Sequence, residues 1–194
     1  MTAGRQPNSE NKDWCTPPDI VHSVREAFGG VIDLDPCSNS LSVVGAVVEY
    51  VLPEHDGLEE PWNFKHIFVN PPYGSDRNRG TRIKNWFVKV AHAADLGSEV
   101  IVLVPVATNT SHWKEYVFPK ASAICFLYTP RVKFIIGGVR DTKGAPMSCC
   151  VIYYGQHFDR FAESFRSHGA VLPLNGAVLP QDQQQLLFID DSSS

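Results

Sequence analysis

This chain has little of what membrane-bound or exported proteins carry. No apolar run in its 194 residues approaches membrane-spanning length, and residues 1–13 are polar, unlike a signal peptide. The five cysteines are odd in number and contain no Cys-x-x-Cys pair, which argues against a disulfide framework and a structural zinc site. We therefore expect a cytoplasmic protein with no membrane partner and no bound metal.

Internal repeats and strong compositional bias are also missing. The chain is 43% hydrophobic and 20% charged, as is ordinary for a globular protein. Its length suits one domain with tails. We expect residues 1–13 to form a disordered arm, residues 14–180 the domain, and residues 181–194 a flexible tail.

Short apolar runs alternate with helical patterns along residues 14–154. Strands are expected at 31–34, 47–52, 66–69, 100–104, 123–128, 132–136 and 148–154. One helix is expected to begin with Thr16 as its cap and Pro17 in its first turn, and another covers 86–94. This alternation predicts an α/β fold with a mostly parallel sheet. The strands at 123–128 and 148–154 have no clear helix between them, which predicts an antiparallel hairpin at one edge.

A turn of sequence Asn-Pro-Pro-Tyr, residues 70–73, directly follows the apolar run 67–69. The Asn70 side-chain oxygen and the Pro71 carbonyl can accept both hydrogens of a planar amino group, whose lone pair is otherwise spread into a ring. Pro71 and Pro72 fix the backbone and remove competing N–H donors, and Tyr73 offers a face for stacking. The turn predicts methylation of an amino nitrogen on a base. The alternative is a Pro-rich turn after a strand.

Positive charge is concentrated in the middle of the chain. Residues 65–143 carry 12 basic and 5 acidic side chains, a balance of +7, whereas residues 1–64 carry −8 and residues 144–194 carry −3. Because the basic part begins just before the turn, it favours a polyanionic partner, with scattered surface charge as the alternative. The loops 75–82 and 137–146 flank the site and are candidates for reading sequence. The expected nucleic-acid contacts are Arg77, Arg79, Arg82, Arg131, Lys133, Arg140 and Lys143.

Acidic residues before the turn suit a methyl donor with an adenosine and an ammonium group. Asp33 and Asp35 end the first predicted strand, and only one of them can face the crevice at the carboxyl ends of the strands; Asp33 is favoured. Pro36 and Cys37 lead into a small-residue loop without the Gly-x-Gly nucleotide signature. Asp56 is expected to accept a hydrogen bond from the donor's adenine amino group. The alternative for each acid is a cap or turn residue.

Six short landmarks follow one another between residues 14 and about 154. They are Trp14-x-Thr16-Pro17-Pro18, Asp33-x-Asp35-Pro36-Cys37, Asp56-Gly57-Leu58, Val69-Asn70-Pro71-Pro72-Tyr73-Gly74, Leu103-Val104-Pro105 and Arg131-Val132-Lys133-Phe134. In this order they resemble the phage-type DNA adenine methyltransferases of the Dam family. The chain departs from the wider class at residues 37–40, where Cys-Ser-Asn-Ser stands in place of glycines.

The resemblance implies a Rossmann-like methyltransferase fold, S-adenosylmethionine as the cofactor and adenine in DNA as the substrate. It also implies that residues 14–18, including Trp14, Thr16 and Pro17, lie against the donor's methionine end. The target base must leave the duplex to reach the turn. Phe134 is then either a second stacking face or a core residue of its strand. We expect a monomer in the cytoplasm of a bacterial host cell.

Other interpretations of the turn stay open. A cytosine amino group is an alternative target, although its turn usually starts with Ser or Asp. A protein-glutamine methyltransferase shares the turn but normally has a glycine-rich donor loop and no need of the basic part. A third alternative is an inactive DNA-binding relic of the fold. A cytosine ring-carbon enzyme with a Pro-Cys nucleophile is disfavoured, because transfer to an amino group needs no covalent intermediate.

The C-terminal segment Gln184–Phe188, of sequence Gln-Gln-Leu-Leu-Phe, lies within a polar stretch. It resembles the short bacterial peptide that binds the replication sliding clamp, although Gln185 and Leu186 depart from that pattern. An extended peptide can place Leu187 and Phe188 in an apolar pocket, at the entropic cost of ordering a free tail. The alternative is that these apolar residues fold back onto the domain.

Overall fold

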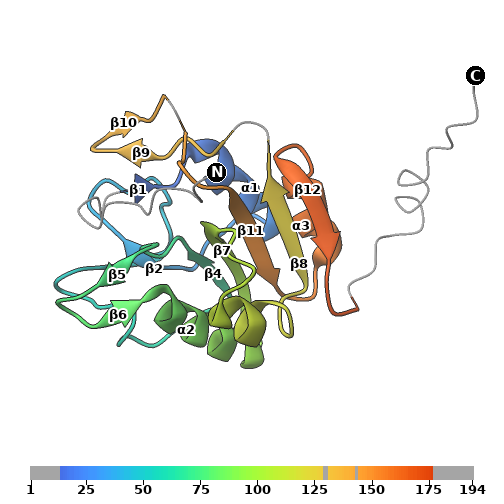
Figure 1. The fold of residues 1–194 in the computed structure, drawn as a ribbon, viewed down its shortest axis with the longest axis horizontal. Coiled ribbons are helices and arrows are strands. Elements are labelled where there is room, and N and C mark those ends of the chain that lie inside the picture. Colours follow the sequence, from blue (N-terminus) through green and yellow to red (C-terminus); the bar gives the residue numbers. More distant parts are fainter. Residues whose placement is uncertain (1–13, 129–130, 143, 177–194) are drawn as a thin grey trace, which may run out of the picture.

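A seven-stranded mixed sheet forms the centre of the molecule (Figure 1). The computed structural model describes residues 14–128, 131–142 and 144–176. Across the sheet the strands lie in the order β12-β8-β11-β7-β4-β2-β3. Their bounds are Leu34–Ser38 for β2, Val48–Val51 for β3, His66–Val69 for β4, Glu99–Pro105 for β7, Ala123–Leu127 for β8, Cys149–Tyr154 for β11 and Gly169–Pro173 for β12.

The prediction of a mostly parallel sheet is only partly right. The pairs β3–β2, β2–β4 and β4–β7 are parallel, whereas β7–β11, β11–β8 and β8–β12 are antiparallel. The antiparallel pairing of the two predicted strands, now β8 and β11, is confirmed. It does not lie at the edge, because β12 covers β8 and β11 inserts beside β7. All six residues of β11 are buried, as an interior position requires.

Helices cover both faces of the sheet. Helices α1 (Pro18–Ala27) and α3 (Phe158–Phe165) pack on one face, and α2 (Ile83–Asp95) and a π-helical turn, η1 (Trp113–Val117), pack on the other. Alternate residues of β7 divide between the two cores: Ile101 and Leu103 face α1 and α3, and Val102 and Val104 face α2. The result is a three-layer α/β arrangement, as the alternation in the sequence predicts. None of the helices in the described ranges is long and apolar enough to cross a membrane.

Two small sheets project from the same side of the central sheet in Figure 1. One is the β5–β6 hairpin, formed by Ser75–Asp76 and Thr81–Arg82. The other joins β1 (Trp14–Cys15) to the β9–β10 hairpin, formed by Ile135–Ile136 and Val139–Arg140. The strand predicted at 132–136 is therefore shorter than expected. Gly137 and Gly138 both have positive φ angles, 56° and 80°, which the tight turn between β9 and β10 requires.

The first two predicted elements have different bounds in the structure. Pro17, rather than Thr16, occupies the N-cap position of α1, so the prediction that Thr16 caps this helix is wrong. The strand predicted at 31–34 begins only at Leu34 and continues to Ser38. The polar residues 35–38 form part of the strand because they pair with β3. A search for apolar runs does not detect such pairing. Asp35, Pro36 and Cys37 consequently lie within the strand.

Candidate active site

The strand order makes the carboxyl ends of β2 and β4 a topological switch point of the sheet. The chain passes from β2 to β3 on one side and then crosses to β4 on the other. Open α/β sheets bind ligands at such switch points, outside the carboxyl ends of the strands. Leu34 of β2 lies opposite Ile67 of β4, which brings Cys37 level with Asn70. The landmark that ends in Cys37 and the Asn-Pro-Pro-Tyr turn therefore meet at this end of the sheet.

The Asn70 side chain is held in one orientation. Its amide nitrogen Nδ2 donates to the carbonyl of Trp14 and to the hydroxyl of Thr16, each at 3.1 Å. Because a backbone carbonyl only accepts, the nitrogen must be the atom that faces Trp14. The amide oxygen Oδ1 points the other way and accepts from the Tyr73 hydroxyl at 3.0 Å. Pro71 is buried beside it and Pro72 is exposed.

Tyr73 supports the turn from inside the protein. Its hydroxyl lies between Asn70 Oδ1 and the carbonyl of Leu103, at 3.3 Å from the latter. Burial raises the pKa of Tyr73 well above its ordinary value, so the phenol stays protonated and remains a donor. The ring meets Phe134 edge-to-face at 5.9 Å, and Phe134 is only 2% exposed. Of the two roles open for Phe134, its burial fits the core residue.

Asp35 and Cys37 connect β2 to the reactive turn. Asp35 is 4% exposed, and its Oδ1 accepts from the backbone N–H of Cys37 at 3.1 Å. Burial raises the pKa of Asp35 to about 7, and the Glu49 carboxylate adds to this, against the opposing effect of the Cys37 N–H. The Cys37 thiol lies against the backbone N–H of Asn70. Its own pKa is raised well above the ordinary value by burial and then by Asp35, so it is a neutral thiol.

Asp33 lies at the other end of the sheet. Its Oδ2 accepts from the backbone N–H of His66, the first residue of β4, at 2.9 Å. Of the two acids, the structure therefore favours Asp35 over the predicted Asp33, because Asp35 is bonded to the N–H of Cys37, beside the reactive turn. Because β2 begins only at Leu34, Asp33 precedes the strand and Asp35 lies within it.

Asp56 and Gly57 pack across β2. A Cβ atom on Gly57 would lie 1.7 Å from the carbonyl oxygen of Pro36, so only glycine allows this approach. One Asp56 oxygen accepts from the Leu58 N–H at 3.0 Å, and the other pairs with the guanidinium of Arg79. Arg79 belongs to the turn of the β5–β6 hairpin. A predicted nucleic-acid contact and a predicted donor contact are thus bonded to each other.

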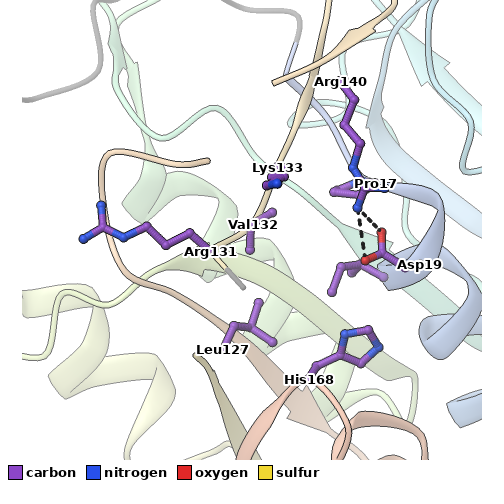
Figure 2. Close-up of a pocket in the computed structure, with 9 residues that line it drawn as sticks. Pro17, Asp19, Leu127, Arg131, Val132, Lys133, Arg140 and His168 are labelled. Carbon is purple, nitrogen blue, oxygen red and sulfur yellow. Dashed lines mark hydrogen bonds and ion pairs between the residues drawn. The ribbon is translucent and has the colours of Figure 1, made fainter. Parts of the chain in front are cut away.

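The other predicted nucleic-acid contacts that the structure describes fall into two groups. Arg77 and Arg82 are exposed on the β5–β6 hairpin, and Arg82 is also the N-cap residue of α2. The second group lines a pocket with Asp19 and His168 (Figure 2); it comprises Arg131, Lys133 and Arg140. Arg140 pairs with Asp19 at 3.2 Å, whereas Arg131 extends away from Asp19 in Figure 2. Lys143 lies outside the described residues.

Sequence reasoning missed the groups that orient the turn. The carbonyls of Trp14 and Leu103 and the hydroxyl of Thr16 belong to two of the sequence landmarks, but their part in holding Asn70 and Tyr73 was not predicted. Their bonds join residues 30 to 56 positions apart, so only the fold reveals them. Within the described part of the chain, no group of three or more His, Cys, Asp or Glu side chains gathers as a metal site.

Comparison with known proteins gives the same assignment. The model of the DNA N-6-adenine-methyltransferase (Dam) family matches residues 4–171. This chain belongs to that family. One relative, the DNA N-6-adenine-methyltransferase of Haemophilus phage HP1 (strain HP1c1), is 22% identical over 135 residues, which cover 70% of this chain and 73% of the relative. No solved structure matches this chain. Family membership makes it an adenine-specific DNA methyltransferase.

Proposed function

We propose that this Dam-family enzyme transfers a methyl group from S-adenosylmethionine directly to the exocyclic amino nitrogen of adenine in DNA. The observation that carries the proposal is the fixed Asn70 amide at the carboxyl end of β4, with its nitrogen bonded to Trp14 and Thr16. That orientation commits Oδ1 to accept hydrogen bonds. An amide oxygen has two acceptor sites, and Tyr73 takes one of them.

The residues at the crevice fit a cationic donor. S-adenosylmethionine carries sulfonium and ammonium charges and supplies an electrophilic methyl group when bound. Asp35 is a buried carboxyl whose pKa burial raises to about 7, so a neighbouring positive charge favours its ionised form. We assign Asp35, Pro36, Cys37 and Asp56 to donor binding. By family resemblance Trp14, Thr16 and Pro17 border the methionine end, and we leave Asp33 out of this set.

The turn activates the amino group by accepting its hydrogens. Asn70 Oδ1 accepts one hydrogen and the Pro71 carbonyl accepts the other, so the nitrogen lone pair is withdrawn from the ring and becomes available for attack. Pro71 and Pro72 have no N–H groups to compete for these acceptors. We assign two roles to Tyr73. Its hydroxyl donates to Asn70 Oδ1 and so helps to orient it, and its ring offers a face on which the base stacks.

DNA approaches from the side on which both hairpins project. Arg77, Arg79 and Arg82 on the β5–β6 hairpin would contact phosphates on one flank of the turn. Arg131, Lys133, Arg140 and Lys143 would contact them on the other. Cations on both sides suit a duplex from which one base is extruded into the crevice. Exposed charge near the reactive turn supports this arrangement.

The test is the transfer of a tritiated methyl group from S-adenosylmethionine to purified macromolecules. Unmethylated duplex DNA is compared with a protein mixture and with DNA that is already adenine-methylated. Label in the unmethylated DNA alone is expected. Label in protein would favour the glutamine alternative. If calorimetry shows that the donor binds but no acceptor is labelled, the proposal fails as an enzyme assignment.

We further propose that the mixed sheet is a Rossmann-like methyltransferase fold within a domain of residues 14–180. In support, β3, β2, β4, β7 and β8 point in one direction, and only β11 and β12 run against them. Limited proteolysis that trims the chain to about these bounds would support the flanking arm and tail. The proposed location is the cytoplasm of a bacterial host cell, with the enzyme as a monomer.

We also propose a replication sliding clamp as a second partner. The segment Gln184–Phe188 lies outside the described residues, so only its sequence supports this proposal. A pull-down with purified clamp compares the full chain with one truncated after Pro180. Retention of the full chain alone would support docking through this segment. No retention of the full chain, or equal retention of both chains, would refute it and favour the alternative in which these residues fold back onto the domain.

A further inference from the structure

The segment that precedes α1 connects the β9–β10 hairpin with the reactive turn. Strand β1 pairs with β9 along both of its residues. Four residues after the end of β1, Asp19 in the first turn of α1 is paired with Arg140 of β10 at 3.2 Å. Residues 14–19 are therefore fixed to the hairpin at both ends.

Both hydrogens of the Asn70 amide are directed to this fixed segment. One points to the Trp14 carbonyl and the other to Thr16 Oγ1, each at 3.1 Å between heavy atoms. Thr16 is 2% exposed, so water does not readily replace its hydroxyl. The terminal torsion of asparagine is otherwise broad. Because the amide group is planar, acceptors for both of its hydrogens determine where Oδ1 points.

We infer that Thr16 is a positioning residue for methyl transfer, which acts by holding the Asn70 amide with Oδ1 toward the substrate amino group. The inference rests on the proposed function, because it assumes that Oδ1 accepts a hydrogen from the substrate. Thr16 acts through Asn70 and does not contact the reacting atoms. This role differs from a helix cap, which Pro17 occupies. It also differs from the donor contact that family resemblance suggests for Thr16.

The hydroxyl of Thr16 is the group to remove. Thr16→Val keeps the volume but leaves one buried hydrogen of Nδ2 without an acceptor, and Thr16→Ser keeps the hydroxyl. We expect Thr16→Val to lower kcat about tenfold, as the loss of one buried hydrogen bond allows. Thr16→Ser should return kcat to within about twofold of wild type. For Thr16→Val, the KM for DNA should stay unchanged, and the Kd of S-adenosylmethionine by calorimetry should change by much less than kcat.

A second measurement guards against a general loss of structure. In the Asn70→Ala background, Thr16→Val should cause no further loss of kcat, because its effect acts through the Asn70 amide. A wild-type kcat in Thr16→Val overturns the inference, as does a weaker donor Kd with unchanged kcat at saturating donor. Additive losses in the double variant overturn it as well. A wild-type enzyme that does not methylate DNA refutes the proposed function itself, and the inference with it.

Discussion

The two ends of the central sheet bury polar groups in contrasting ways. At the carboxyl ends of β2 and β4, neutral groups predominate: the Asn70 amide, the Tyr73 phenol and the Cys37 thiol. At the amino end, Glu99 is 7% exposed and accepts from the Tyr153 hydroxyl at 2.5 Å. It also lies 3.5 Å from the Arg160 guanidinium and 4.0 Å from the His66 imidazole.

The contrast shows that buried titratable groups do not by themselves locate an active site. Burial lowers the pKa of His66 and raises that of Tyr153, just as a catalytic cluster would show. Yet the Tyr153 hydroxyl is bonded to Glu99 and His66 lies 4.0 Å from the same carboxylate, and the switch point lies at the opposite end of the sheet. At the carboxyl end the Asn70 oxygen keeps an acceptor site, so that end can act on a substrate while the amino end stabilises the fold.

The largest effect should follow from removal of the Asn70 amide. Asn70→Ala is expected to lower kcat about 100- to 1,000-fold, as for loss of one group that acts mainly in the transition state. The Kd of the donor, measured by calorimetry, should change little. Asn63→Ala, at an exposed position just before β4, is the control. Near-normal turnover of Asn70→Ala would contradict the assignment of catalysis to the carboxyl end of the sheet.

Glu99→Gln should have the opposite profile. It weakens the buried hydrogen bond from the Tyr153 hydroxyl and removes the charge that faces the partly exposed Arg160 guanidinium, and the free energy of unfolding should fall by about 2 kcal/mol. Urea denaturation at pH 7 measures this change, and kcat per folded molecule should be unaltered. Glu163→Gln breaks an exposed pair with Arg166 and should cost about 1 kcal/mol or less. A selective fall in kcat with unchanged stability would contradict the structural role.

Stability should depend on pH with opposite signs at the two ends. The folded pKa of His66 is below its ordinary value of 6.5, so its contribution to stability is lost as pH falls through 6.5. The folded pKa of Asp35 is raised from 3.8 to about 7, so the native state favours its protonated form, and stability is lost as pH rises through about 7. In Asp35→Asn, the unfolding free energy should therefore rise more steeply between pH 5 and 7 than in wild type. An unchanged profile would show that Asp35 does not titrate in this range.

The smallest effect concerns surface charge near the two ends. Arg77→Gln, on the β5–β6 hairpin, should weaken DNA binding a few-fold and reduce the slope of log affinity against log salt by about 1. Lys65→Gln is the matched control, because Lys65 is exposed just before β4 at the amino end. Titrations by fluorescence anisotropy at several salt concentrations measure both slopes. Equal effects of the two variants would mean that DNA is not confined to the hairpin side.

Local patterns predicted much of the carboxyl end. Strand β4 is confirmed at its predicted bounds, residues 66–69, because an apolar run is ended there by two prolines. The apolar stripe of 86–94 lies within α2, and the face of α1 that includes Val21 and Val24 is buried as its spacing requires. The position of Asn70 after a buried strand could be predicted for the same reason.

Contacts between distant segments could not be predicted. Thr16 stands before two prolines, as the N-cap residue of a helix often does. Only the pairing of β1 with β9 places its hydroxyl beside Asn70. The start of β2 depends on hydrogen bonds to β3 rather than on its own side chains. The ion pair of Arg79 with Asp56 likewise joins residues that only the tertiary fold brings together. Helix α3 and strand β12 were not predicted, although Phe158, Phe161 and Phe165 have helical spacing.

The most direct test of the account is nucleoside analysis by mass spectrometry after reaction of wild-type enzyme and unmethylated DNA with methyl-deuterated S-adenosylmethionine. If the Asn70 turn activates the adenine amino group, deuterated N6-methyladenine should form, and its initial rate of formation should fall about 100-fold or more when Asn70 is replaced by Ala. Deuterated N4-methylcytosine, or N6-methyladenine formed equally well by Asn70→Ala, would contradict the account.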